Sequence, residues 1–211
     1  MNTKVLFWAL FFLQIFVLLA IAISYYPQGV WVDQEILYAL HETSNPLLDK
    51  FASFFTNLGI YGATTPILLL LSLVLAYQQK WRYLLYVAIT SLGSVALTYE
   101  TKSLFSRIRP HLWQSSYPWL NSFSFPSGHA LSSMILVMIL ATVSWHSKWR
   151  ILVIILGSIF VILIAWTRMY LGVHYPSDIL GGWSLAIAWS LLVQAVILSV
   201  TENRNTILKN E

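Results

Sequence analysis

Six stretches of the sequence are apolar over lengths that match the hydrocarbon core of a lipid bilayer. A transmembrane helix needs about 20 mostly apolar residues. The six stretches cover about residues 5–25, 61–77, 83–104, 126–145, 151–171 and 175–200. Charged residues make up only 9% of the chain, whereas a soluble domain contains about 25%. The sequence therefore predicts an all-α, integral membrane six-helix bundle, formed by a single membrane-embedded domain over residues 1–211.

The segment 27–57 separates the first two apolar stretches and mixes polar with apolar residues. This pattern is typical of short amphipathic helices that lie in the membrane interface. A cleaved signal peptide is an alternative for the first stretch, because Lys4 precedes it and Ala20-Ile21-Ala22 resembles a cleavage site. We favour a membrane span, since the apolar run continues through Ile23 and is longer than a usual signal core.

Lysine and arginine are distributed unequally between the two sides that six spans would define. Seven of them fall on the side of the N-terminus: Lys4, Lys80, Arg82, Lys148, Arg150, Arg204 and Lys209. The opposite side has Lys50 and four cations within or beside the polar motifs described below. Because cytoplasmic loops are enriched in Lys and Arg, we expect both termini in the cytoplasm and the polar loop 105–125 outside.

Charge and cysteine content exclude several kinds of site. The formal net charge is +4, and the cations are scattered singly, so we expect no nucleic-acid partner. The chain has no cysteine, which excludes a disulfide framework, a thiolate metal site and a cysteine nucleophile.

Three polar motifs lie at the outward ends of predicted spans. They are Lys102-x6-Arg109-Pro110, Pro126-Ser127-Gly128-His129 and Thr167-Arg168-x5-His174-x3-Asp178. Charges in or beside a membrane span are costly and usually functional. Lys102, Arg109 and Arg168 could together neutralise a phosphate, and arginine can bind it bidentately. The motifs therefore favour chemistry on a phosphate group.

The second and third motifs add the groups that phosphoryl transfer needs. If Pro126 occupies the first turn of a helix, the backbone N–H groups of Ser127 and Gly128 are free to bind an anion. His174 and Asp178 share one face if the sixth span begins as a helix there. The carboxylate could then hold one ring nitrogen and leave the other as a nucleophile. His129 has no carboxylate at that spacing and is the better candidate for a general acid.

The order and spacing of these motifs resemble the three-part signature of the type 2 phosphatidic acid phosphatase superfamily, over about residues 102–178. The resemblance implies that His174 becomes phosphorylated, that Asp178 supports it and that His129 protonates the leaving group. It also implies that the phosphoryl oxygens are held by Lys102, Arg109, Ser127, Gly128 and Arg168. It implies no metal or cofactor. Thr167 stands where the superfamily usually has serine and keeps the hydroxyl.

The same resemblance implies a metal-independent lipid phosphate phosphatase at the outer face of the cytoplasmic membrane. Undecaprenyl diphosphate, phosphatidylglycerol phosphate, phosphatidic acid and its lyso form all present a suitable phosphate, and the motifs do not separate them. A lipid phosphotransferase and a non-catalytic lipid transporter are alternatives. A vanadium-dependent haloperoxidase of the same superfamily is a further one, but those proteins are typically soluble.

Three other polar residues, Glu100, Arg107 and His111, lie near the motifs. We expect Arg107 to meet anionic headgroups rather than the substrate phosphate, and Glu100 to support Lys102 through a salt bridge. A contact between His111 and the substrate is the less favoured interpretation of that residue. The sequence does not indicate an oligomeric state.

Overall fold

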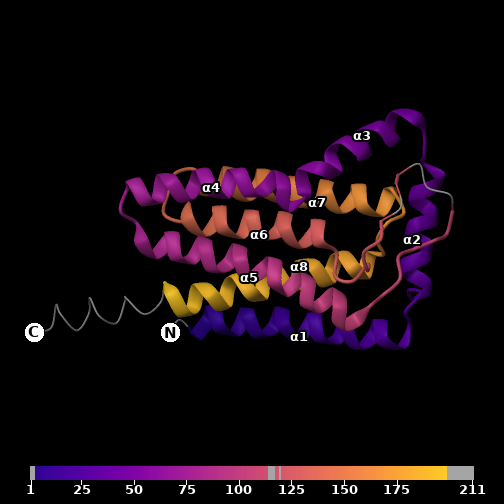
Figure 1. The fold of residues 1–211 in the computed structure, drawn as a ribbon, viewed down its shortest axis with the longest axis horizontal. Coiled ribbons are helices and arrows are strands. Elements are labelled where there is room, and N and C mark those ends of the chain that lie inside the picture. The colour runs from indigo at the N-terminus through magenta and orange to yellow at the C-terminus, as the bar shows by residue number, and fades with distance from the viewer. Residues whose placement is uncertain (1–2, 114–116, 119, 199–211) are drawn as a thin grey trace, which may run out of the picture.

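The computed structural model describes residues 3–113, 117–118 and 120–198. Within these residues it is entirely helical (Figure 1). The helices are α1 (Thr3–Tyr25), α2 (Trp31–Glu42), α3 (Pro46–Thr56), the short 3₁₀ helix η1 (Asn57–Gly59), α4 (Tyr61–Tyr77), α5 (Trp81–Phe105), α6 (Gly128–Val143), α7 (Arg150–Tyr170) and α8 (Pro176–Ile197). The all-α prediction is therefore confirmed for the described part of the chain.

The centre of the bundle is α8, which contacts α1, α5 and α6 along its length and α2 at one end. Small residues on α8 let these neighbours approach closely, as is common where helices pack in membranes. Gly181 faces the ring of Phe125, and Gly182 faces the backbone of Ser127. The second of these contacts sets the distance between α8 and the start of α6.

Large apolar side chains cover much of the outside of the bundle, which is the reverse of a water-soluble fold. On α1, for example, Phe7 is 62% exposed and Leu18 is 58% exposed. Among the described residues, three helices are long and apolar enough to cross a membrane, namely α1, α7 and α8. The pair formed by α3–η1 and α4 passes the same test together, with a bend of 43°, and α6 is a shorter apolar helix.

The six predicted spans thus correspond to helices α1, α4, α5, α6, α7 and α8, while the number that crosses the membrane stays a prediction. The last residues of the sixth predicted span, 199–200, and the tail cations Arg204 and Lys209 lie outside the described residues. The predicted interfacial segment forms α2 and α3. Their location in the membrane interface likewise stays a prediction.

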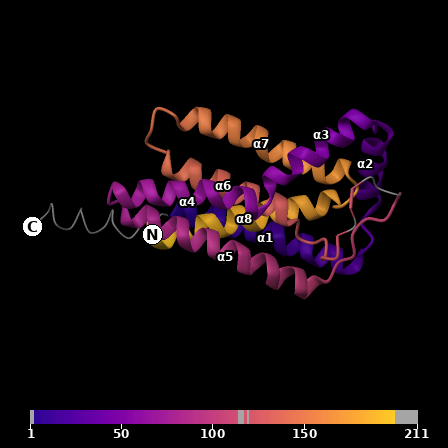
Figure 2. The ribbon, with the colours of Figure 1, turned by 45° about the horizontal axis from the view of Figure 1, so that its top comes forward.

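The two ends of the bundle differ in structure. Helix α2 runs across one end, next to α3, whereas the first turn of α1 and the last turn of α8 lie at the other end (Figures 1 and 2). Asn45 connects α2 to α3 and caps α3, because its side-chain oxygen accepts hydrogen bonds from the N–H groups of Leu47 and Leu48. The polar motifs lie at the α2 end.

Candidate active site

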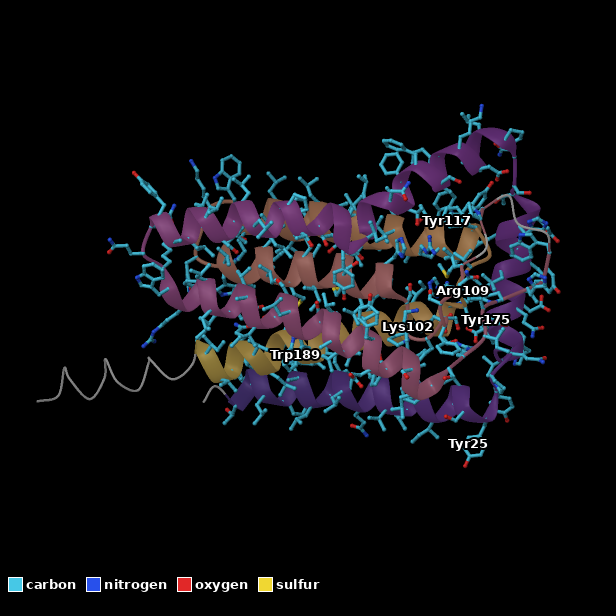
Figure 3. All side chains as sticks on the ribbon, viewed as in Figure 1. Tyr25, Lys102, Arg109, Tyr117, Tyr175 and Trp189 are labelled. Atoms are coloured by element: carbon cyan, nitrogen blue, oxygen red, sulfur yellow. The ribbon has the colours of Figure 1, made fainter. Side chains whose placement is uncertain are left out.

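The end of the bundle beside α2 brings together residues from all three polar motifs. They come from the last turn of α5 (Lys102), the loop between α5 and α6 (Arg109), the start of α6 (Ser127, Gly128, His129), the last turn of α7 (Arg168) and the start of α8 (His174, Asp178). Figure 3 shows Lys102, Arg109 and Tyr175 near one another at this end. Residues up to 76 positions apart in the sequence thus form one cluster.

His174 and Asp178 are in contact, as the sequence predicted. The Nδ1 atom of His174 lies 3.3 Å from Oδ2 of Asp178, and both side chains are buried. His174 lies in the loop before α8, however, and is not on its helical face. The contact forms because Asp178 is the third residue of α8 and folds back to accept the N–H of Tyr175 at 2.9 Å, in the manner of a capping box.

The contacts of His174 define which ring nitrogen carries the proton. Nε2 lies 2.9 Å from Nη1 of Arg109, and a guanidinium can only donate. Nε2 is therefore the acceptor, and the neutral ring carries its proton on Nδ1, which donates to Asp178. Burial, followed by the charges of Arg109, Arg168 and Lys102, lowers the pKa of His174 well below its usual value. The ring is consequently neutral, with its Nε2 lone pair directed at the cations.

Arg109 is held by the loop and by the segment before α8. Its Nε and Nη2 donate to the carbonyl and hydroxyl of Ser122, both at 2.8 Å, and its Nη1 donates to the carbonyl of Val173 at 2.7 Å. Burial and then the charge of Arg168 lower the pKa of Arg109 to about 10. Arg109 therefore remains charged at neutral pH, beside the nucleophilic nitrogen of His174.

Arg168 is completely buried, yet part of its guanidinium is unused. Nη1 donates to the hydroxyl of Thr56 on α3 at 2.7 Å. Nε and Nη2 have no hydrogen-bond partner among the described residues. A buried donor without a partner is costly, so this arrangement is expected where a ligand supplies the acceptor. The ring of Tyr117 lies 5.3 Å from the guanidinium carbon.

One prediction about the start of α6 is wrong. The N–H of Ser127 is not free, because it donates to the backbone carbonyl of Asp178 at 3.0 Å. The helix begins at Gly128, and the hydroxyl of Ser127 caps it by accepting the N–H of Ala130 at 3.5 Å. The unpaired N–H groups of the first helical turn therefore belong to Gly128 and His129. The anion site predicted for this helix end moves along the chain by one residue.

Lys102 is half-buried, and its ammonium donates to the carbonyl of Phe123 in the same loop that holds Arg109. The prediction of a salt bridge between Glu100 and Lys102 is wrong, because Glu100 is exposed and no ion pair links the two residues in the described part of the chain.

His111 is exposed and, with Arg109, lines a hollow of about 380 Å³ at the surface. His129 is the second residue of α6, next to Gly128, and its charge contributes to the lowered pKa of His174.

The position of Arg107 in the structure differs from the one expected from the sequence. Its side chain is buried instead of facing lipid headgroups, and Nη1 donates to Oδ1 of Asp178 at 2.5 Å. Asp33 on α2 lies 3.5 Å from Nη2 of the same guanidinium. An ion pair between residues so far apart leaves no pattern in the sequence. The only available signal was the presence of an arginine within the first motif.

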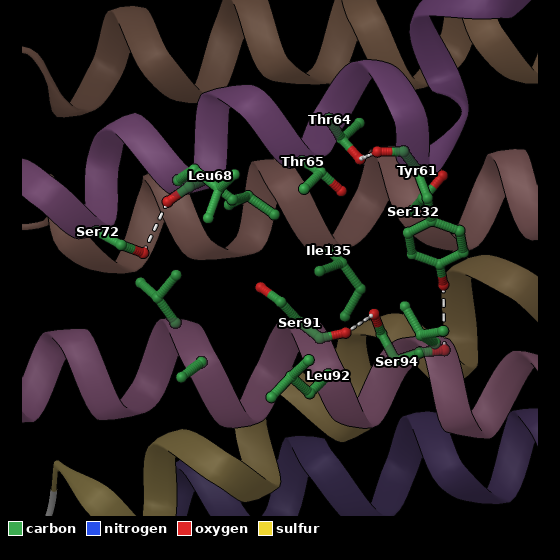
Figure 4. Close-up of a pocket in the computed structure, with 14 residues that line it drawn as sticks. Tyr61, Thr64, Thr65, Leu68, Ser72, Ser91, Leu92, Ser94, Ser132 and Ile135 are labelled. Carbon is green, nitrogen blue, oxygen red and sulfur yellow. Dashed lines mark hydrogen bonds between the residues drawn. The ribbon is translucent and has the colours of Figure 1, made fainter.

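A mostly apolar groove runs along the bundle between α4 and α5 (Figure 4). It encloses about 280 Å³ and ends near Tyr61, whose hydroxyl donates to the carbonyl of Ser94 at 3.1 Å. That hydroxyl also lies 2.9 Å from the hydroxyl of Thr98. A side chain at Gly128 would touch Thr98 and Lys102. The groove therefore ends beside the cluster.

Comparison with known proteins agrees with this geometry. Residues 79–202 match the model of the PAP2 superfamily, which is more than half of the chain. This chain belongs to the PAP2 superfamily. Members of it that resemble the chain are named for phosphatase activity, and the chain is accordingly a phosphoric ester hydrolase. The family resemblance inferred from the three motifs is thereby confirmed.

Several relatives align with most of this chain. Phosphatidylglycerophosphatase B of Bacillus subtilis is 28% identical over 77% of this chain and 81% of its own length. An undecaprenyl-diphosphatase of Sulfolobus acidocaldarius is 25% identical over 86% of both chains. The crystal structure of a transmembrane PAP2-type phosphatidylglycerolphosphate phosphatase from Bacillus subtilis superimposes with a TM-score of 0.77 at 26% identity, covering 89% of this chain and 94% of that one. The fold is therefore that of a PAP2 membrane phosphatase.

Proposed function

We propose that the chain is a metal-independent lipid phosphate phosphatase that works through a phosphohistidine at His174. The observation that carries the proposal is the orientation of this ring. The protonated Nδ1 of His174 donates to the carboxylate of Asp178. The other ring nitrogen, Nε2, faces the cations that would hold a phosphoryl group. A nucleophile oriented by a carboxylate, next to preorganised positive charge, is what covalent phosphoryl transfer requires.

The reaction has two steps. Nε2 of His174 attacks phosphorus, the bond between phosphorus and the lipid oxygen breaks, and His129 gives its proton to that oxygen. A water molecule then attacks the phosphohistidine, His129 takes up the proton of the water, and the N–P bond breaks to release inorganic phosphate. The equatorial oxygens are held by Lys102, Arg109 and Arg168, with N–H groups from the first turn of α6.

The cations have distinct parts in this proposal. The unpaired Nε and Nη2 of Arg168 bind two phosphoryl oxygens in a bidentate way. Arg109 exchanges its hydrogen bond to Nε2 of His174 for one to a phosphoryl oxygen, which frees the lone pair for attack. The hydroxyl of Ser127 remains a candidate phosphate ligand, as the family signature implies.

The proposal places the site at the outer face of the cytoplasmic membrane. Six crossings by α1, α4, α5, α6, α7 and α8 would form a single membrane-embedded domain and leave both termini on the cytoplasmic side. The support is the uneven distribution of Lys and Arg in the sequence. A second support is that the first turn of α1 and the last turn of α8 lie at the end of the bundle opposite the site (Figure 1). In this orientation α2 and α3 lie in the outer interface.

A lipid substrate fits the apolar groove between α4 and α5. Its hydrocarbon chain would lie along Leu68 and Leu92, while the phosphate reaches the cluster beyond Tyr61. The named activities of relatives make phosphatidylglycerol phosphate and undecaprenyl diphosphate the first substrates to test.

The decisive experiment measures inorganic phosphate released by purified protein in detergent, with EDTA present. Undecaprenyl diphosphate, phosphatidylglycerol phosphate and phosphatidic acid are tested in parallel. We expect release from at least one lipid and loss of release in His174→Ala. His146→Ala is the control and should release phosphate normally, because His146 is exposed and lies between α6 and α7, at the end of the bundle opposite the site. Substrate labelled in the phosphate should leave an acid-labile label on the wild type but not on His174→Ala.

Three results would contradict the proposal. One is no release from any lipid by folded protein, and another is loss of activity in EDTA that added metal restores. The third is undiminished release by His174→Ala. Transfer of label to an added alcohol without release of phosphate would instead indicate a phosphotransferase.

A further inference from the structure

Arg107 is buried on the side of Asp178 that faces away from His174. Nη1 of Arg107 donates to Oδ1 of Asp178 at 2.5 Å and to the hydroxyl of Ser177 at 2.9 Å. Its Nε donates to the carbonyl of Pro27, between α1 and α2, at 3.0 Å. The two oxygens of Asp178 therefore have separate tasks, since Oδ1 binds Arg107 and Oδ2 binds His174.

Asp33 on α2 holds the same guanidinium from the other side. Its Oδ2 lies 3.5 Å from Nη2 of Arg107 and accepts the hydroxyl of Ser177 at 2.7 Å. Its Oδ1 accepts the backbone N–H of Ser177 at 2.9 Å, in the first turn of α8. The ring of Tyr175 lies 4.2 Å from the guanidinium carbon. Arg107 is thus fixed by contacts from α2, from the α1–α2 connection and from α8.

This enclosure separates Arg107 from the cations that face the substrate. The side chain of Arg107 is 1% exposed; its Nε and Nη1 donate to protein acceptors, and its Nη2, which makes no hydrogen bond in the described structure, faces the Asp33 carboxylate at 3.5 Å. Arg168, by contrast, has two donors without a hydrogen bond and no carboxylate beside it among the described residues. Arg107 could not bind phosphate without giving up Asp178, so a direct role in substrate binding does not fit its contacts.

We propose that Arg107 is a positioning residue for the phosphoryl transfer, with Asp33 as its anchor; this inference rests on the function proposed above. Without Arg107, the remaining side-chain donor near Oδ1 of Asp178 among the described residues is the Ser124 hydroxyl at 3.5 Å. The N–H of Tyr175 still holds Oδ2 at 2.9 Å, but Oδ1 has lost its charged partner, so the plane of the carboxylate can turn relative to Nδ1 of His174. Arg107 and the N–H of Tyr175 together fix both oxygens of the carboxylate, which keeps the proton on Nδ1 and the lone pair on Nε2.

The test compares Arg107→Gln, Arg107→Lys, Asp178→Asn and the double variant Arg107→Gln/Asp178→Asn with the wild type. Arg150→Gln serves as the matched control, because Arg150 is an exposed arginine at the other end of α7 from the site. For each protein, kcat and KM for phosphate release are measured on the best lipid substrate, and folding is checked by thermal unfolding in the same detergent. The separate values of kcat and KM distinguish positioning from substrate binding.

We expect Arg107→Gln to lower kcat by about 100-fold, which is the upper range for losing a hydrogen bond between charged groups. The KM should change less than about threefold, because Arg107 does not touch substrate. Arg107→Lys should recover part of the loss, since lysine restores one charge but not the planar fork. The double variant should be no slower than Asp178→Asn alone, because both changes remove the same support of His174.

Several results would overturn this inference while leaving the phosphatase function intact. They are a kcat within about threefold of wild type in folded Arg107→Gln, a raised KM with unchanged kcat, or losses that multiply in the double variant. If Arg107→Gln does not fold, Asp33→Asn decides, because it leaves the bond between Arg107 and Asp178 in place. It should lower kcat by about 3- to 10-fold at unchanged KM, and an unchanged kcat would exclude the anchor. A wild type inactive on every lipid would instead count against the proposed function.

Discussion

Replacing Gly182 by alanine should impair catalysis more than stability, because Gly182 sets the distance between α8 and the start of α6. A methyl group at this position would lie 2.8 Å from the backbone oxygen of Ser127 and 3.2 Å from the backbone nitrogen of Leu131. Ordinary contacts begin near 3.4 Å. Because these neighbours are backbone atoms and cannot rotate away, the start of α6 must move by about 0.6 Å, the difference between 3.4 and 2.8 Å.

The size of the effect follows from that displacement. A misplacement of about 1 Å in an active site can cost about 100-fold in rate, so about 0.6 Å corresponds to a loss of roughly 10-fold in kcat. Overpacking a core costs about 1–3 kcal/mol, while alanine in a helix gains about 0.5–1 kcal/mol over glycine. The free energy of unfolding should therefore fall by no more than about 2.5 kcal/mol. The protein remains folded but is slower.

Gly62→Ala on α4 is the matched control. A methyl group there would have one neighbour, the side chain of Ile60 at 3.9 Å, so we expect normal activity and equal or higher stability. The assay measures kcat for phosphate release and thermal unfolding of both variants in one detergent. Wild-type kcat in Gly182→Ala would refute the reasoning, because the contact between α8 and α6 would then not determine the geometry of the site.

Three further predictions follow from the site and its surroundings. Arg168→Lys should weaken competitive inhibition by vanadate about 10- to 100-fold, because lysine cannot use both vacant donor positions; equal inhibition would exclude the bidentate role. The pKa of buried His174 lies below the 6.5 of an unfolded histidine. Below pH 6.5 the unfolded state therefore binds more protons than the folded state. The free energy of unfolding should fall in that range by up to about 1.4 kcal/mol for each pH unit of acidification. His174→Gln should lack this part of the slope when unfolding is followed from pH 7.5 to 5.5. Tyr170→Phe removes the bonds of the Tyr170 hydroxyl to Asp49 and to the N–H of Asn45, and should speed hydrogen exchange in α3 while leaving α8 unchanged.

The six long helices α1, α4, α5, α6, α7 and α8 could be predicted well because each lies in a separate apolar run. The stretch 61–77 has the same bounds as α4, and the stretch 151–171 differs from α7 by one residue at each end. The sequence does not, however, say which helices cross the membrane. Helix α5 is the longest in the described part of the chain, with 25 residues, but is not among the helices apolar enough for a span. Its hydroxyl residues, such as Thr90 and Thr98, face the bundle.

The site could be predicted where its contacts lie close together in the sequence or where a motif is specific. His174 and Asp178 are four residues apart, and their contact was predicted and found. The helix start at Gly128 could not be placed to one residue, because it depends on the cap made by Ser127 and on the bond from Ser127 to Asp178. The pairing of Arg107 with Asp33 depends on how α2 folds over the site.

The charges of the buried cluster explain why such a polar site is compatible with this fold. Four cations gather there in the described structure, namely Lys102, Arg107, Arg109 and Arg168, together with two carboxylates, Asp33 and Asp178. Arg107 with its two carboxylates has a formal charge of −1, and the three cations around His174 add +3, so the cluster as a whole has a formal excess of two positive charges. A phosphate ester carries a charge of about −1.5 to −2 at neutral pH. The substrate therefore neutralises a charge that the protein leaves unmatched, and a buried excess of this size favours a dianionic phosphate over a neutral lipid headgroup.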